Sequence, residues 1–556
     1  MERELVVVST RTARGLLVAG LLLGLGTSVL VATAFPATGM RGTAQRPVKE
    51  GGNLVLGSPY VDYIDPALVP DPMSTFSVTA AVAAWAVEDA SCATLLRYAA
   101  GPPLMQDYTA VPEVATGPPA VTRDGRTYTF TIRKGFRFST GAPVTARNYV
   151  RAIERLINPA MRSPAAKYLQ EVAAVKAAGR RLIIHLTKRV PDFPARLTMP
   201  YTCPVPNDLP IDPEGVGAPL PGSGPYYIAE FVRGSRVVLK RNPFYGGRRA
   251  HHVDRLVVQV EDVNTMSRKV EAGAMDIDLG VPLNRLSELA KRYDVNRGRL
   301  FSVPSANMYY LYMNTERPLF RGNVKLRQAV NFALDRAKLV YSFTEGAPYA
   351  ASATDDYLPR GLPGYVDAAL YPLKRPDLKK ARALARRHKR GGKAVLYTCE
   401  GANFSCLSNA QRIQADMKEI DLEIEIKQFP VSEYFAKFGT RGEPFDLLLD
   451  RLLVPWVDPW QYMNLQLDGR MLRPTGNTNR SFFNSRGYNV RIDQVGQVAG
   501  RARYNAYGRL ARDTARDYAP MAAAFVRNTR FFVSERVGCV RVSAHGLDLT
   551  GLCLKS

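Results

Sequence analysis

The sequence predicts an α/β protein with more than one lobe. Its 556 residues exceed the length at which a single hydrophobic core stops growing, so two or three lobes are expected. A hydrophobic content of 46%, with 39 prolines and 43 glycines, is typical of a globular protein with many turns. Segments with the period of a strand and segments with the period of a helix occur along the chain, and residues 123–156 contain both.

Residues 123–156 predict a strand, a second strand and a helix, in that order. After an Asp-Gly turn, residues 127–132 alternate threonine with large apolar side chains, which is the pattern of a half-buried strand. A Lys-Gly pair interrupts this strand, and we expect Phe136 and Phe138 to begin a second one. Thr145 has a side chain suited to a helix N-cap and precedes a helical apolar stripe.

The other predicted elements follow from the same two patterns. Strands are expected at 181–186, 310–313 and 394–398, together with a hairpin in residues 228–245. Helices are expected at 78–96, 324–336 and within the basic stretch 373–393. The run 504–532 predicts a helix, a loop and a strand.

The N-terminus predicts export. Arg11 and Arg14 precede an apolar run over residues 15–35, and Ala32-Thr33-Ala34 offers a small-residue cleavage site. The run is also long enough to cross a bilayer, so residues 1–34 are either a Sec-type signal peptide or an N-terminal anchor. An uncleaved segment would hold the protein at the membrane surface. Since the first cysteine is Cys92, lipid attachment just after the signal is excluded.

The six cysteines are an even number, which suits disulfides in an exported protein. Cys399 and Cys406 could close a short loop, Cys539 and Cys553 lie near the C-terminus, and Cys92 and Cys203 would form a long-range pair. The alternative is that some are buried free thiols. Because no pair has C-x-x-C spacing and the five histidines are dispersed, we expect no metal site and no cofactor.

The net charge of +25 admits nucleic acid, anionic membranes, cell-wall polymers or acidic ligands as partners. No zinc-finger spacing, RNA-binding aromatic motif or basic zipper accompanies the charge, so we expect no nucleic-acid partner. The sequence also lacks a G-x-S-x-G elbow, an H-E-x-x-H motif and a Walker lysine motif. We therefore expect a protein that is not an enzyme.

Five motifs in order resemble the extracytoplasmic solute-binding proteins of ABC importers, family 5, the dipeptide/oligopeptide-binding type. They are the 123–156 unit, the opening Gly51–Gly57 with Asp65-Pro66, the turn Pro221–Tyr227, the pair 253–258 and 271–277, and the segment 310–336. The resemblance covers about residues 50–545. It implies a bilobal α/β fold of the periplasmic-binding-protein type (type II, cluster C) with an additional inserted subdomain.

The resemblance also implies domain boundaries. Residues 35–50 would be a connector, 93–215 the inserted subdomain and 307–518 lobe II. Lobe I would be assembled from residues 51–92, 216–306 and 519–556. Such a protein is a monomeric extracytoplasmic receptor that closes by a hinge and delivers its solute to ABC permease subunits. Peptides are the first expectation for the solute, and oligosaccharides, nickel complexes and opines remain open. The alternative class is an extracytoplasmic enzyme or cell-wall interaction protein on the same scaffold.

The resemblance places the ligand site in the segment FDLLLDRLLVPWVDPWQY, residues 445–462. The expected ligand-binding residues are Trp456, Asp458, Trp460, Tyr462, Asn403 and Phe404. Two of the three tryptophans of the chain lie within this segment and suggest a flat apolar wall, with core packing as the alternative.

This segment also departs from the peptide-binding members of the family. These members carry an aspartate, which neutralises the peptide ammonium, where this chain has Pro455. Asp450 or Asp458 could substitute for it. Pro70 and Pro72 also follow Asp65-Pro66, where relatives pair with the peptide backbone, and neither can donate an N–H. A free α-peptide is therefore less certain as the ligand.

Overall fold

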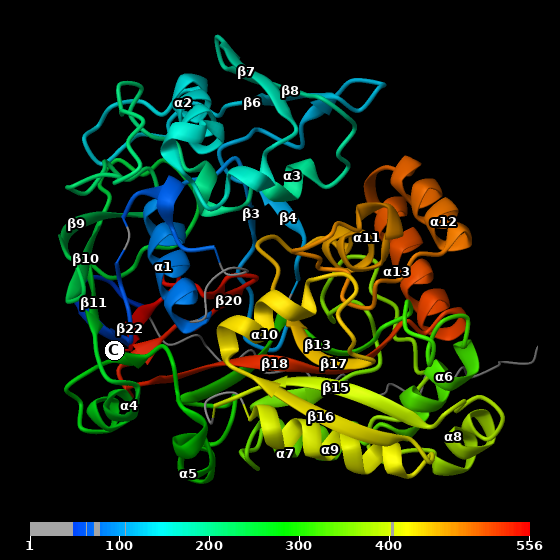
Figure 1. Ribbon diagram of the computed structural model, residues 1–556. Helices are drawn as coiled ribbons and strands as arrows, with labels where there is room; N and C mark the ends of the chain where they lie inside the picture. Colours follow the sequence, from blue (N-terminus) through cyan, green and yellow to red (C-terminus); the bar gives the residue numbers. More distant parts are fainter. Residues whose placement is uncertain (1–47, 63, 72–77, 106, 402–404, 556) are drawn as a thin grey trace, which may run out of the picture. The chain divides into compact units, whose positions relative to one another are not determined.

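The computed structural model describes residues 48–62, 64–71, 78–105, 107–401 and 405–555 (Figure 1). The predicted signal or anchor and most of the connector lie outside these described residues. So do Asn403, Phe404 and Pro72. Residues 46–556 form one compact unit, which contains all the elements below.

A mixed sheet of 11 strands runs through this unit, in the order β16-β15-β17-β13-β18-β12-β2-β11-β10-β9 with β14 beside β18. Its strands are β2 (Asn53–Ser58), β9 (Tyr226–Val232), β10 (Arg236–Arg241), β11 (Arg255–Val260), β12 (Ile277–Asp278), β13 (Leu300–Met313), β14 (Ala351–Ala353), β15 (Lys393–Cys399), β16 (Glu423–Phe429), β17 (Leu447–Leu452) and β18 (Met521–Val533). The mixture of parallel and antiparallel pairs, with helices packed on the sheet, gives the α/β class that the sequence predicts.

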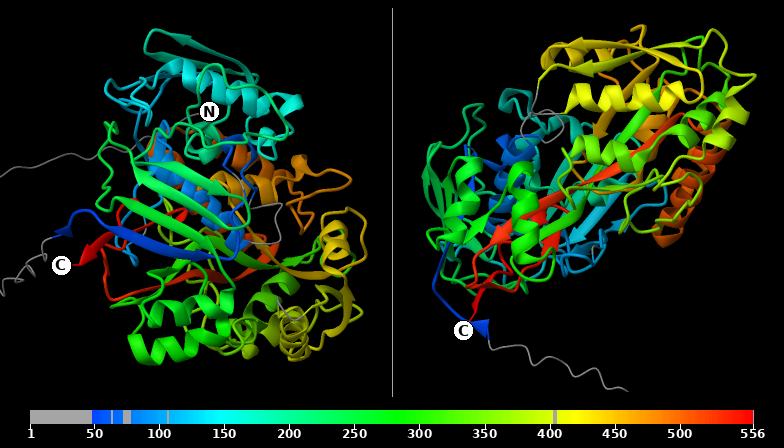
Figure 2. Two further views of the ribbon diagram at one scale, coloured as in Figure 1. Left: turned by 90° about the vertical axis from the view of Figure 1, so that its left-hand side faces the viewer. Right: turned by 90° about the horizontal axis from the view of Figure 1, so that it is seen from below.

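Two long antiparallel strands, β13 and β18, join the halves of this sheet (Figures 1 and 2). They pair from Leu300 opposite Phe532 to Tyr312 opposite Met521. At one end β18 pairs with β12, and at the other end β13 pairs with β17. The chain therefore passes between the two halves of the sheet along two neighbouring strands.

A separate four-stranded sheet has the order β5-β6-β8-β7. It consists of β5 (Ala120–Val121), β6 (Thr127–Thr131), β7 (Val172–Ala178) and β8 (Arg181–Leu186), and α2 (Ala146–Ile157) packs on it. The alternating side chains of β6 explain this packing, because Tyr128 and Phe130 are buried while the threonines are half-buried. The hydrophobic core between α2 and this sheet also includes Trp456, which is distant in sequence.

Helices cover the large sheet and its edges. In Figure 1, α7, α8 and α9 lie on one side of β15 and β16, and α10 lies on the other. The helices are α1 (Val78–Ser91), α3 (Phe193–Arg196), α4 (Val263–Glu271), α5 (Leu283–Tyr293), α6 (Val324–Ala333), α7 (Arg336–Phe343), α8 (Leu378–Ala385), α9 (Cys406–Lys418), α10 (Val431–Phe438), α11 (Pro459–Leu467), α12 (Arg486–Gln497) and α13 (Gly500–Asp517). The short strands are β1 (Val48–Lys49), β3 (Leu96–Tyr98), β4 (Ala110–Pro112), β19 (Val537–Gly538), β20 (Val542–Ser543), β21 (Gly546–Leu547) and β22 (Cys553–Lys555).

The unit 123–156 matches the prediction at its strand and its helix but not between them. Thr145 caps α2, and its backbone N–H donates to Asn148 Oδ1 at 2.8 Å. The second strand predicted at Phe136 and Phe138 is wrong. The chain turns at Gly135 (φ 94°) and Gly141 (φ 84°), so both phenylalanine rings enter the core from loops.

The helix predicted at 324–336 is two helices. Leu334 has extended backbone after α6 ends at Ala333, and Asp335 is the N-cap of α7. The Asp335 carboxylate accepts from the Lys338 N–H at 3.0 Å. An aspartate that completes a cap at this position outweighs the apolar periodicity that continues through Leu334.

The six cysteines are paired as Cys92–Cys203, Cys399–Cys406 and Cys539–Cys553, the pairs named from the sequence. Their Cα atoms lie 5.4 to 5.6 Å apart, within the range that a disulfide spans. In the part of the chain that is described, no helix has the length and apolarity needed to cross a membrane.

Candidate functional site

A cavity of about 720 Å³ lies between residues 167–196 and residues 435–480. On the first side, its lining comes from the 3-10 turn Ala166–Tyr168, the residues after it, and α3. On the second side, α10, β17, α11 and the loop that ends at Arg480 supply the lining. Its volume lies in the range typical of sites that enclose a small organic ligand.

Trp456 and Trp460 form an aromatic wall of this cavity. Their rings are stacked, with centroids 6.5 Å apart and an interplanar angle of 23°. The Arg196 guanidinium lies 5.0 Å from the Trp456 ring centroid and 5.4 Å from that of Trp460. Trp456 is 3% exposed and belongs to the core under α2, whereas Trp460 is half-buried. The two tryptophans therefore differ in role: Trp456 fixes the wall in the core, and Trp460 exposes its ring to the cavity.

Asp458 does not line the cavity but stabilises the segment that carries the two tryptophans. It is fully buried, it caps α11 by accepting from the Trp460 N–H at 2.9 Å, and it pairs with Arg503 at 2.6 Å. Burial alone would lower the pKa of Arg503, but the charge and hydrogen bonding of Asp458, together with the charges of Tyr507 and Asp192, raise the pKa overall. The guanidinium therefore stays charged beside the carboxylate.

Tyr462 is also fully buried and outside the lining. Its hydroxyl donates to the Ala306 carbonyl at 2.7 Å, which ties α11 to β13. Of the six residues expected at the ligand, the structure thus brings Trp456 and Trp460 to the cavity, places Asp458 and Tyr462 behind it, and does not describe Asn403 and Phe404.

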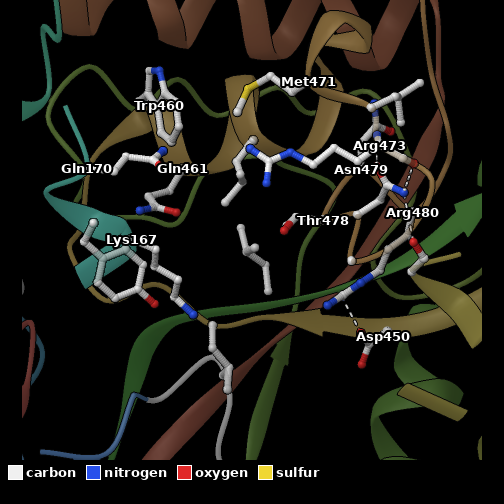
Figure 3. Close-up of a pocket in the computed structure, with 18 of the residues that line it drawn as sticks. Lys167, Gln170, Asp450, Trp460, Gln461, Met471, Arg473, Thr478, Asn479 and Arg480 are labelled. Carbon is white, nitrogen blue, oxygen red and sulfur yellow. Dashed lines mark hydrogen bonds and ion pairs between the residues drawn. The ribbon is translucent and has the colours of Figure 1, made fainter. Parts of the chain in front are cut away.

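The two acidic side chains that the described part of the chain contributes to the lining both form ion pairs. Asp450 pairs with Arg480, as the dashed line in Figure 3 shows. Glu171 pairs with Arg196 at 2.9 Å and with Lys188 at 3.5 Å. Burial alone would lower the pKa of Arg196, but the carboxylates of Asp192 and Glu171 raise it overall. Asp450 therefore lies in the lining, where a substitute for the missing aspartate is needed. Its charge, however, is already neutralised by Arg480.

The lining also contains polar groups that the sequence analysis did not single out. Gln461 is 1% exposed, and neither its Oε1 nor its Nε2 has a hydrogen-bond partner in the described residues. A buried polar group left unsatisfied costs about 1–3 kcal/mol, so such a group is usually completed by water or by a ligand. Figure 3 shows Gln461 beside Gln170 and the Trp460 ring at one side of the cavity. The sequence does not single out Gln461, because a missing hydrogen-bond partner becomes visible only in the folded structure.

Asp355, Asp356 and Asp367 form an acidic cluster elsewhere in the protein, with carboxylate oxygens within 4.8 Å of one another. Two of these carboxylates already accept backbone N–H groups, Asp356 from Ala368 and Asp355 from Leu370 and Tyr371. Burial raises the pKa of Asp356 to about 6. These bonds give the cluster a structural role in holding the loop 355–371.

The fold and the cavity define a protein of the periplasmic-binding-protein class, in which a mixed α/β scaffold encloses a solute site. The structure superposes on "Clavulanic acid biosynthesis oligopeptide binding protein 2" with a TM-score of 0.77 and 22% identity, covering 92% of this chain and 97% of that one. HbpA2 from Haemophilus parasuis gives the same TM-score at 18% identity, with 91% and 100% covered.

The sequence matches the family of bacterial extracellular solute-binding proteins, family 5, over residues 109–471, and the chain belongs to this family. The oligopeptide-binding protein OppA of Bacillus subtilis is 28% identical over 47% of this chain and 51% of its own length. Heme-binding protein A of Haemophilus influenzae is 24% identical over 67% of this chain and 71% of its own length. The chain spans about half the length of the first curated relatives that it matches. Proteins of this family are typically receptors without catalysis.

Proposed function

We propose that the protein captures an extracytoplasmic solute in the cavity beside Trp460 and delivers it to an ABC importer. The observation that carries this proposal is the cavity itself, whose lining comes from two distant stretches of the chain, 167–196 and 435–480. A solute that contacts both stretches favours a closed arrangement over an open one, because its affinity for the two states differs. Closure of this kind is how a receptor signals its loaded state to a permease.

Peptides are the first class of solute that we propose. Relatives named for oligopeptides support this choice, and so do structures of DppA from Helicobacter pylori with the peptide STSA and of Haemophilus influenzae OppA with RPPGFSPFR. A non-peptide solute is the second candidate. It is favoured by the ion-paired state of Asp450 and Glu171, which leaves no free carboxylate in the described lining for a peptide ammonium.

A binding screen of the whole protein tests the receptor function. Thermal-shift measurements and titration calorimetry with a library of peptides, oligosaccharides and other family ligands should yield a solute that binds tightly and is recovered chemically unchanged. Small-angle X-ray scattering with that solute should give a smaller radius of gyration. Conversion of a bound compound into a product would instead support an enzyme on this scaffold, and a bound solute without any compaction would contradict hinge closure.

A further inference from the structure

Most of the positive charge around the cavity is already paired. Among the described residues, seven basic side chains line it, and five of them have carboxylate partners: Lys167, Lys188, Arg196, Arg470 and Arg480. Arg473 and Arg451 have no such partner among the described residues. Arg473 is exposed, and Figure 3 shows its side chain extending across the cavity toward the side where Gln461 lies. A guanidinium without a carboxylate partner can form a bidentate pair with the carboxylate of a ligand.

A cationic group would find no such partner. The described acidic side chains of the lining, Glu171 and Asp450, are each bound by a guanidinium. An ammonium group that enters the cavity would lose its hydrating water, and no free carboxylate in the described lining would compensate for this loss. It would also be repelled by the positively charged arginines. The lining thus discriminates against a free amino terminus by repulsion as well as by the lack of a partner.

Gln461 adds a second requirement for the ligand. Its free Oε1 accepts and its free Nε2 donates, so a group with both an N–H and a carbonyl completes both atoms. A secondary amide has this pair of groups. The lining also contains apolar side chains that suit an aliphatic or aromatic body: Leu452, Leu453, Leu465, Met471 and Leu472.

We propose that the cavity takes an anionic solute without a free ammonium group, namely an N-acylated amino acid or a short N-blocked peptide. Its carboxylate pairs with Arg473, one of its amides bonds to Gln461, and its apolar side chains lie against Trp460 and the leucines. This inference rests on the proposed receptor function and specifies the chemistry of the solute.

Three matched probes test the two ends of the ligand separately: N-acetyl-Leu-Leu, free Leu-Leu, and N-acetyl-Leu-Leu amide. Each is titrated into the whole protein by calorimetry. The N-acetyl carboxylate should bind about tenfold or more tightly than either of the others, which is the discrimination expected from one charge-assisted bond. Tighter binding of free Leu-Leu would overturn the inference and leave the receptor function standing. Failure of all three to bind would also overturn it, while the library screen would still decide the receptor function.

Variants locate the effect in the cavity. Arg473→Gln should lower the affinity for N-acetyl-Leu-Leu about tenfold. It should leave the affinity for the C-terminal amide unchanged, because only the carboxylate pairs with the guanidinium. Arg233→Gln, at the turn between β9 and β10, removes the same charge outside the lining and should change neither affinity. Gln461→Leu should lower the affinity for both acetylated probes while the unfolding midpoint rises or stays constant, since it removes two unsatisfied groups. Equal effects of Arg473→Gln and Arg233→Gln would overturn the assignment.

Discussion

The indole Nε1 of Trp456 donates to Asp192 Oδ2 at 3.2 Å, although 264 positions separate the two residues. Arg196 binds the same carboxylate through its Nε at 2.9 Å and lies over the Trp456 ring. The cavity wall on the 435–480 side is therefore fixed to the α3 segment by a hydrogen bond and a cation–π contact. The Trp460 ring stacks on the Trp456 ring that is held in this way.

Trp456→Ala should mainly lower the stability of the protein, whereas Trp460→Ala should mainly lower its affinity for the solute. Trp456 is 3% exposed, so its truncation leaves a cavity in the core under α2 and should cost about 3–5 kcal/mol of unfolding free energy. Trp460 is half-buried and lines the cavity, so its truncation should mainly lower the affinity for the solute. Urea unfolding and calorimetry on both variants check this. Equal losses of stability would show that both residues are core.

Asp458→Asn should destabilise the protein although it keeps the cap of α11. An asparagine oxygen can still accept from the Trp460 N–H, but the charge that neutralises buried Arg503 is lost. Breaking a buried pair in this way costs about 3–5 kcal/mol. Asp517→Asn breaks the exposed pair with Arg516 and is the matched control, with an unfolding midpoint expected to stay within error. A tolerated Asp458→Asn change would exclude a structural role for the pair.

The three disulfides should contribute unequally to stability. Their sequence separations are 111, 14 and 7 residues for Cys92–Cys203, Cys539–Cys553 and Cys399–Cys406. In the chain-entropy description, closing a loop of about 100 residues stabilises by about 4.7 kcal/mol and a loop of about 15 residues by about 3 kcal/mol. Paired Cys→Ala variants should therefore lose unfolding free energy in the order Cys92–Cys203, Cys539–Cys553, Cys399–Cys406. The reverse order would contradict this entropic account.

Asp278 should make the protein less stable as the pH rises. Burial raises its pKa to about 6, against the opposing hydrogen bonds from Ser267 and Gly280 and the charge of Arg530. In an unfolded chain the same carboxyl titrates near pH 4, so between about pH 4 and 6 the native state holds a proton that the unfolded state releases. The stabilisation is complete below about pH 4 and is lost as the pH rises through about 6.

Asp278→Asn removes this titration. The unfolding free energy of the variant relative to the natural sequence should rise by about 1–3 kcal/mol from pH 4 to pH 7. Urea unfolding at several pH values measures the difference. A difference between the two proteins that does not change with pH would show that Asp278 titrates normally.

Much of the fold follows from local sequence, and the exceptions have local causes. Side-chain alternation sets the strand over 127–131, and a turn sets the hairpin β9–β10. The cap at Thr145 is set by its N–H and hydroxyl, which both donate to Asn148 Oδ1. The apolar period continues through Leu334, so periodicity alone predicts one helix there, although Asp335 offers a cap for a second.

The site was harder to predict than the fold. The tryptophan wall was visible as two aromatic residues in five positions, but the distant partners of Asp458 and Trp456 were not. Gln461 has no hydrogen-bond partner and Arg473 no carboxylate partner in the described part of the chain, and only a three-dimensional arrangement can reveal a missing partner.

The proposed receptor function requires that the solute binds beside Trp460. Trp85→Phe leaves Trp456 and Trp460 as the tryptophans of the chain, so emission from this variant reports on the cavity wall. Titration with N-acetyl-Leu-Leu, or with the solute that the library identifies, should shift this emission at the concentration at which calorimetry detects binding. A solute that leaves the emission spectrum unchanged, and that binds Trp460→Ala with the same affinity, would place the site elsewhere and contradict binding beside Trp460.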